Sequence, residues 1–241
     1  FGQLCTEDKE FYYEPFDSET DDAYLFGARL NFAFNEQFGA SINYLNLDFD
    51  EWNEGDQYVW WVAPYVNFTP EITLRGAYFQ QSIDGVGDEN SLWKAILDVK
   101  QEALGFTSVW IEYVDVDKDF YAWTASRLQG GYGTGGLAQY DDFGGPMTPG
   151  LGEGMQAGTA LFVRLDQQWD EKWATFQRWA TCKLDGNFFG FDPDTTFWTF
   201  GVKYWYTPAI MFELSYDDVS YGDFWIPEDN NMIRLRTHVW F

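Results

Sequence analysis

The sequence lacks any long apolar run. Although 46% of its 241 residues are hydrophobic and 21% are aromatic, its mean hydropathy is only -0.37, so apolar and polar residues must be interleaved. No stretch approaches the roughly 18 consecutive apolar residues of a membrane-spanning helix. A transmembrane helix is therefore excluded. The only other architecture that satisfies all backbone polar groups in lipid is a closed β-barrel.

Positive charge and cysteine are scarce as well. The chain has 14 Lys and Arg residues against 39 Asp and Glu residues, which gives a formal net charge of -25. Such a chain does not bind nucleic acid through its phosphates, because the two repel each other. The two cysteines, Cys5 and Cys182, allow at most one disulfide and follow no metal-ligand spacing. We therefore expect no metal site and no cofactor.

The chain does have strict alternation, most clearly in residues 230–241. One face of an extended strand there is largely apolar and the other is largely cationic: Ile233, Leu235, Thr237, Val239 and Phe241 oppose Arg234, Arg236, His238 and Trp240. Side chains of a strand alternate between its two faces. An apolar face opposite a cationic face, closed by a terminal aromatic residue, is typical of bacterial outer-membrane barrels, where lipid contacts one side and water the other.

Turn signals divide the chain into eleven predicted strands, each of the length that a tilted membrane strand requires. We place them at 22–34, 38–49, 57–68, 71–83, 92–101, 105–116, 157–169, 173–184, 195–206, 209–221 and 230–241. The connections alternate between short turns, such as Thr69-Pro70, and long acidic loops, such as 185–194. The predicted fold is therefore all-β, a transmembrane antiparallel β-barrel of the outer membrane with about 11–12 strands in this chain.

The strand count predicts that residues 1–241 form a single barrel domain that lacks N-terminal strands. Single-chain bacterial barrels have an even number of strands, whereas eleven are found here. Two explanations remain open: residues 1–13 supply a twelfth strand, or the chain is part of a larger even-stranded barrel. We favour the second, because alternation in residues 1–13 is poor.

Most of the few cations fall on the polar faces of the predicted strands. We predict that seven of them line a water-filled lumen: Arg29, Arg75, Lys94, Arg164, Lys203, Arg234 and Arg236. On the lipid face near the bilayer midplane, each would cost about 2–4 kcal/mol. Exclusion from lipid is one sufficient reason for their position. A cationic wall that holds anions and sets selectivity is the other.

Three strands depart from the pattern. Strand 38–49 changes phase near Tyr44 and Leu45, which suggests a β-bulge, and Pro64 removes a ladder donor from strand 57–68. In strand 173–184, Arg178 shares a face with apolar residues, namely Ala174, Phe176, Ala180 and Leu184. We interpret that face as the outer one and expect it to meet a neighbouring subunit.

The segment 117–156 is too long for a plain connection. It either folds into the lumen as a constriction or extends as a mobile extracellular loop. As a constriction it places carboxylates opposite the basic wall, at Asp117, Asp119, Asp141 and Asp142. Asp115, Asp117 and Asp119 also have calcium-ligand spacing, but Phe120 stands where the calcium loop of helix-loop-helix sensors needs glycine, so that motif fails.

Three functions other than that of a channel are an enzyme, a carbohydrate-binding protein and a structural or adhesive protein. The single histidine, His238, lies three residues from the C-terminus, out of reach of an extracellular catalytic triad, so we predict no catalytic residues and no enzyme. A soluble aromatic-rich β-sandwich that binds carbohydrate is the first alternative. A structural or adhesive barrel with a plugged lumen is the second.

The alternating strands, the terminal Phe241 and the long internal loop resemble general diffusion porins of the Gram-negative outer membrane. Segments 108–113 (SVWIEY) and 38–45 (FGASINYL), with the closing strand, are similar to the barrel of porins that carry S-layer-homology domains in diderm Firmicutes. The resemblance implies passive diffusion of ions and small hydrophilic solutes across the cell outer membrane. It also implies contact with outer-membrane lipid and lipopolysaccharide, assembly into a homo-oligomer (a trimer), and a peptidoglycan tether through a segment not in this chain.

Overall fold

The computed structural model describes residues 2–3, 23–49, 57–83, 90–117, 120, 158–184, 195–220 and 230–241. These residues form the strands β1 (Gly2–Gln3), β2 (Ala23–Ala33), β3 (Phe38–Phe49), β4 (Gln57–Thr69), β5 (Ile72–Ile83), β6 (Ser91–Val99), β7 (Ser108–Val116), β8 (Gly158–Gln168), β9 (Trp173–Leu184), β10 (Thr195–Thr207), β11 (Ile210–Ser220) and β12 (Asn230–Val239), with one short helix, α1 (Gln101–Leu104). The predicted all-β class and the eleven predicted strands are confirmed, with ends shifted by at most three residues.

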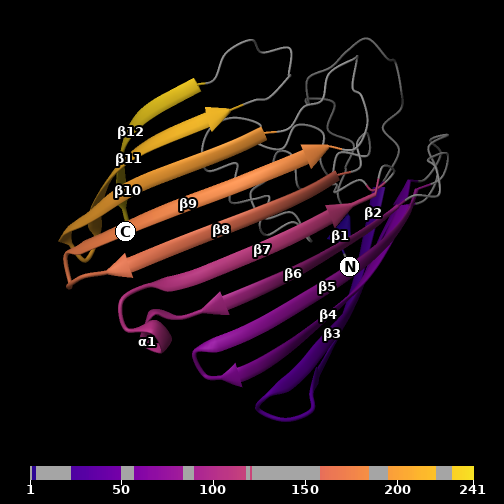
Figure 1. Ribbon diagram of the computed structural model, residues 1–241. Coiled ribbons are helices and arrows are strands. Elements are labelled where there is room, and N and C mark those ends of the chain that lie inside the picture. The colour runs from indigo at the N-terminus through magenta and orange to yellow at the C-terminus, as the bar shows by residue number, and fades with distance from the viewer. Residues whose placement is uncertain are drawn as a thin grey trace, which may run out of the picture.

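All the strands belong to one antiparallel sheet, and their order in the sheet is their order in the chain. The sheet curls around a central space (Figure 1). A sandwich requires two sheets packed face to face, so the sandwich interpretation is wrong. Among the described residues no pairing joins β12 to β1 or β2, and this part of the sheet is open. No helix in the described ranges is long and apolar enough to cross a membrane.

Side chains that accept backbone hydrogen bonds close the short turns. Asn35 Oδ1 accepts hydrogen bonds from the backbone N–H groups of Gln37 and Phe38, both at 2.8 Å. Asp170 Oδ1 likewise accepts from the N–H groups of Lys172 at 2.7 Å and Trp173 at 2.8 Å. Such local acceptors favour tight turns over continued strand. The described turns all lie at one end of the sheet (Figure 1).

The bulge predicted at Tyr44 and Leu45 is wrong. β3 pairs with β2 and with β4 without any shift of register. Tyr44 lies beside Trp60 on one face, and Leu45 lies beside Val59 on the other. The pattern breaks because both faces carry apolar residues at this level, not because the backbone is irregular. At Pro64 the β4–β5 pairing is interrupted, since it resumes only at Tyr65 and Arg75 after Val62 and Tyr78.

Candidate functional site

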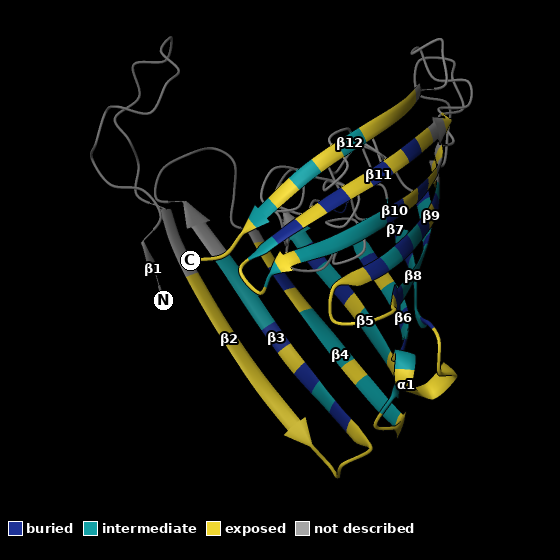
Figure 2. Cartoon of the chain, turned by 90° about the vertical axis from the view of Figure 1, so that its left-hand side faces the viewer, coloured by how far each residue is buried: buried dark blue, intermediate teal, exposed yellow. Residues whose placement is uncertain are grey.

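Burial alternates along β11 and β12 and distinguishes an inner from an outer face. In β11, Glu213, Ser215 and Asp217 are buried, whereas the residues between them are exposed (Figure 2). In β12, Leu235 is 73% exposed, whereas the side chain of Arg234 is only 12% exposed. We call the concave, less exposed side of the sheet the inner face.

The seven residues predicted to line a lumen all lie on the inner face. Cross-strand register places each beside other inner residues: Arg29 opposite Asn43, Arg75 opposite Ile96, Lys94 opposite Ala77, Arg164 opposite Arg178, Lys203 opposite Glu213, Arg234 opposite Ser215 and Arg236 opposite Glu213. Six of the seven form ion pairs with carboxylates of the same face. Arg29 Nε instead donates a hydrogen bond to Asn31 Oδ1 at 2.8 Å.

On β5, β6 and β7 the cations and carboxylates form closely matched pairs. Arg75 Nη2 donates to Asp98 Oδ2 at 2.9 Å, and Lys94 Nζ lies 3.5 Å from Glu112 Oε1. Glu112 is fully buried, and its Oε2 also accepts a hydrogen bond from Trp110 Nε1 at 3.1 Å. A buried carboxylate requires such partners, because leaving it without them is costly.

On β10, β11 and β12 two carboxylates organise the cations. Asp217 accepts hydrogen bonds from Thr199 Oγ1 at 2.7 Å and from Arg234 Nε at 2.6 Å. Glu213 lies between three basic side chains: Lys203 Nζ at 3.8 Å, Arg236 Nη1 at 3.9 Å and His238 Nε2 at 4.0 Å. The sequence did not reveal these carboxylates as partners, because their register becomes known only from the folded hairpins.

The outward assignment of Arg178 is wrong. It lies opposite Arg164 of β8 and Thr199 of β10, on the inner face, and is 8% exposed. The turn between β8 and β9 sets the register that decides the face on which Arg178 lies. The backbone N–H of Trp169 donates to the carbonyl of Trp173 at 3.0 Å, and counting outward from this closing pair places Arg164 opposite Arg178.

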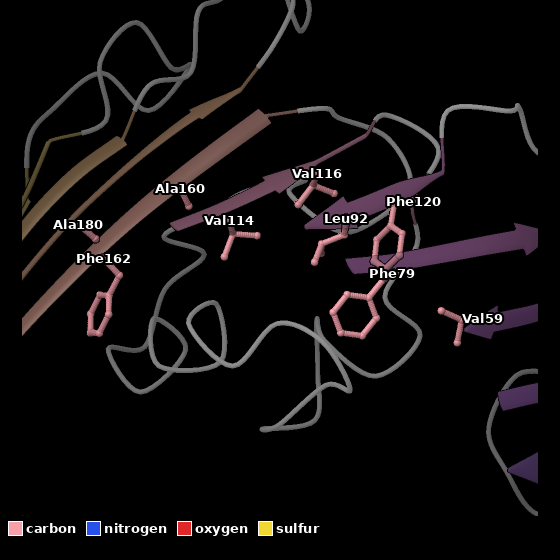
Figure 3. Packing of buried hydrophobic residues seen from close by; sticks show 9 residues of the cluster. All are labelled: Val59, Phe79, Leu92, Val114, Val116, Phe120, Ala160, Phe162 and Ala180. Atoms are coloured by element: carbon pink, nitrogen blue, oxygen red, sulfur yellow. The ribbon is translucent and has the colours of Figure 1, made fainter. Parts of the chain in front are cut away.

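The inner face also carries an apolar cluster that the sequence did not predict. It spans β4 to β9 near the ends that lead into the long connections (Figure 3), and its buried members are Val59, Phe79, Leu92, Val114, Val116, Phe120, Ala160, Phe162 and Ala180. Phe120 follows β7 and packs edge-on against Phe79, with ring centroids 6.4 Å apart. The chain therefore returns over the inner face immediately after β7.

Of the predicted constriction carboxylates, only Asp117 lies within the described residues. Its Oδ2 accepts a hydrogen bond from the backbone N–H of Ser91 at 3.0 Å and another from the Ser91 hydroxyl. Asp117 thus ties the end of β7 to the start of β6. Asp119, Asp141 and Asp142 lie outside the described residues. In the described ranges no group of three His, Cys, Asp or Glu side chains is placed to hold a metal ion.

The outer face is apolar and rich in aromatic residues. Leu214, Phe200 and Phe212 point outward with Leu235. Exposed aromatic side chains stand near strand ends, among them Trp93, Trp169, Trp173 and Tyr206. Amphipathic rings at these positions are typical of a membrane–water interface.

Comparison with known proteins gives structural matches alone. No family model matches the sequence, and no curated protein matches it. A porin structure refined at 1.8 Å is 14% identical, with a TM-score of 0.56, over 99% of this chain and 66% of that chain. This chain therefore spans less than two thirds of that protein. The NanC porin is 12% identical, with a TM-score of 0.44, over 91% of this chain and 94% of that chain.

Proposed function

From its porin fold, we propose that this chain is the barrel of an outer-membrane porin, a channel without catalytic activity. It lets ions and small hydrophilic solutes diffuse passively through a lumen lined by basic residues. The observation that carries the proposal is the contrast between the two faces of one curled sheet: ion pairs on the inner face and aliphatic and aromatic side chains on the outer face. Water at the inner face explains the ion pairs, and hydrocarbon at the outer face explains the aliphatic and aromatic side chains.

The outer face suits the cell outer membrane. Its apolar middle would contact hydrocarbon, and its exposed tryptophans would lie at headgroup level. The long connections would lie on the outside of the cell, beside lipopolysaccharide.

Further strands must complete the barrel. Among the described residues, β2 pairs with β1 at Tyr24 and Leu25 alone, and β12 pairs with β11 on one side alone. In hydrocarbon, unpaired backbone groups cost several kcal/mol each. We therefore infer that strands beyond the described residues close the sheet into a larger, even-stranded barrel.

The segment 117–156 is our candidate constriction. Phe120 supports this role because it is buried in the inner apolar cluster, against Phe79. Asp117 fixes the start of the segment through Ser91. A segment that starts on the inner face is well placed to narrow the lumen and to set Asp119, Asp141 and Asp142 opposite the basic wall.

A polar cluster on the outer face marks the proposed contact with a second copy in a homo-oligomer, which we take to be a trimer. Gln167 Nε2 donates to Thr107 Oγ1 at 2.8 Å and to Gln177 Oε1 at 3.1 Å, while Gln167 Oε1 accepts from Thr175 Oγ1 at 2.8 Å. Thr107 and Gln167 are buried, whereas Thr175 and Gln177 are partly exposed on the side that elsewhere is apolar. Polar groups within a membrane favour a protein neighbour over hydrocarbon.

The double variant Gln167→Leu/Gln177→Leu is expected to weaken association between copies about tenfold, which corresponds to about 1.4 kcal/mol. The fraction of oligomer in unheated detergent gels across a dilution series measures this change. Val202→Leu, on the outer face of β10, is the matched control and should leave the oligomer fraction as it is. An unchanged fraction in the double variant would show that the contact lies elsewhere.

The function is tested by conductance. The full-length protein, refolded and added to planar bilayers, should produce open channels whose reversal potential in a salt gradient shows only mild ion preference, because acidic loops oppose the basic wall. Altered migration of unheated samples reports that the barrel has folded. A folded barrel with no conductance would instead favour the structural or adhesive role with a plugged lumen.

A further inference from the structure

Two ion pairs flank one tryptophan on the inner face. Trp110 of β7 lies directly opposite Asp98 of β6 on one side and Arg164 of β8 on the other. Asp98 Oδ2 accepts a hydrogen bond from Arg75 Nη2 at 2.9 Å, and Asp166 Oδ2 accepts one from Arg164 Nε. We call Arg75, Asp98, Trp110, Arg164 and Asp166 the tryptophan site.

The indole of this site is held in place. Its Nε1–H donates to Glu112 Oε2 at 3.1 Å, and Arg75 Cζ lies 5.5 Å from the ring centroid. A cation–π contact of this kind holds a guanidinium beside the ring. Trp110 also packs against the inner apolar cluster and is half-buried. Part of its apolar surface is therefore open to the inner space, next to fixed polar groups.

The two ion pairs are balanced in charge but retain hydrogen-bonding capacity. Among the residues that the structure describes, Arg75 donates hydrogen bonds through Nη2 alone and Arg164 through Nε alone, although each guanidinium carries further N–H donors. The side chains of Arg75 and Asp98 are 43% and 25% exposed, and those of Arg164 and Asp166 are 33% and 29% exposed. Donors and acceptors are thus accessible on both sides of the indole.

We propose that the tryptophan site binds a short neutral saccharide as it passes through the lumen. This inference rests on the proposed function, since it needs a water-filled lumen. A sugar hydroxyl both donates and accepts, so it can bond to a carboxylate and a guanidinium without separating them. Hydrogen bonds to charged groups are stronger than those between neutral groups. The apolar C–H face of a sugar ring suits the flat apolar surface of an indole.

The arrangement favours a saccharide over an ion or a small zwitterion. The four charges of the site sum to zero, so neither anions nor cations gain from binding there. β6 and β8 lie two strand spacings apart, roughly 10 Å, with the indole of Trp110 between them. A saccharide carries hydroxyls around its whole rim and can reach both ion pairs. An amino acid such as glycine carries both charges at one end and can engage only one pair.

Block of bilayer conductance by sucrose and by maltose is the test. In concentrated KCl, where long-range attraction between charges is screened, each sugar should reduce the current through the full-length wild-type channel in a saturable way. A polyethylene glycol of similar mass, which has few donors, should reduce the current only in proportion to its concentration. Glycine should not give saturable block.

The double variant Arg75→Leu/Asp98→Leu should raise the half-blocking concentration of both sugars at least about tenfold, which corresponds to about 1.4 kcal/mol. It removes the polar groups on one side of Trp110 and leaves the net charge of the chain unchanged. Arg164→Leu/Asp166→Leu does the same on the other side, and it serves as the second variant if the first does not fold.

Glu171→Gln/Lys172→Gln is the matched control, because it also removes one positive and one negative charge, at exposed positions in the turn between β8 and β9. It should leave sugar block unchanged. No saturable block by either sugar, equal block in wild type and both site variants, or saturable block by glycine would overturn the site while leaving the porin intact. Absence of any conductance from folded wild-type protein would overturn the porin itself and the site with it.

Discussion

Replacement of Leu214 by arginine is expected to lower the free energy of unfolding in lipid vesicles by about 2–4 kcal/mol. Leu214 is 52% exposed on the outer face, near the middle of β11, and pairs with Leu235 of β12. In the proposed membrane position its new guanidinium would enter hydrocarbon near the midplane. Denaturant titration of the protein folded into vesicles measures the change.

The control for this substitution is an arginine at a different depth in the membrane. Val239→Arg, near the end of β12 and also exposed, places the same group close to the interface, where the cost falls to about 0–1 kcal/mol. A steep difference between the two positions would support a lipid-facing outer surface. Equal small costs at both positions would contradict it.

Replacement of Glu112 by leucine is expected to destabilise the fold by about 3–5 kcal/mol, because it leaves the ammonium of Lys94 buried without its carboxylate. The Lys94 side chain is 12% exposed and that of Glu112 is fully buried. The Nε1–H of Trp110 would lose its acceptor as well. Equilibrium unfolding in vesicles again gives the magnitude.

The double variant Lys94→Leu/Glu112→Leu separates the ion pair from general packing. Removing both charges should recover most of the loss, since an apolar pair of similar volume replaces a buried ion pair with little cost. Glu102→Leu, on the exposed surface of α1, should change stability by less than about 0.5 kcal/mol. If the double variant is no more stable than Glu112→Leu alone, the carboxylate acts through other contacts than Lys94.

The strands and the placement of the seven cations on one face of the sheet were predictable, because apolar and charged residues alternate with the period of a strand. Arg234 and Arg236 alternate with Ile233 and Leu235, and any strand with lipid on one side must place the charges on the other. Turn residues such as Asn35 and Asp170 mark the ends of the strands independently. The alternation of residue types and the turn residues give the same strand ends, so the strands of the sheet could be derived from the sequence alone.

The inner apolar cluster and the position of Arg178 could not be derived in that way. Alternation separates two faces but does not say which one is inner when both carry apolar residues. Phe176 and Ala180 are apolar, yet they lie inside, and Gln177 is polar, yet it lies outside. Only the cross-strand register, set by the closing pair at Trp169 and Trp173, decides between them.

Because sheet order follows chain order throughout, every hairpin is an exchangeable module. In the described part of the sheet each hairpin pairs with its predecessor and its successor, so duplicating or deleting one hairpin would alter the circumference without changing the order of the remaining strands. Diameter grows roughly linearly with strand number in such cylinders. In a closed barrel of the proposed kind, copying a contiguous piece of the gene would thus widen the aperture.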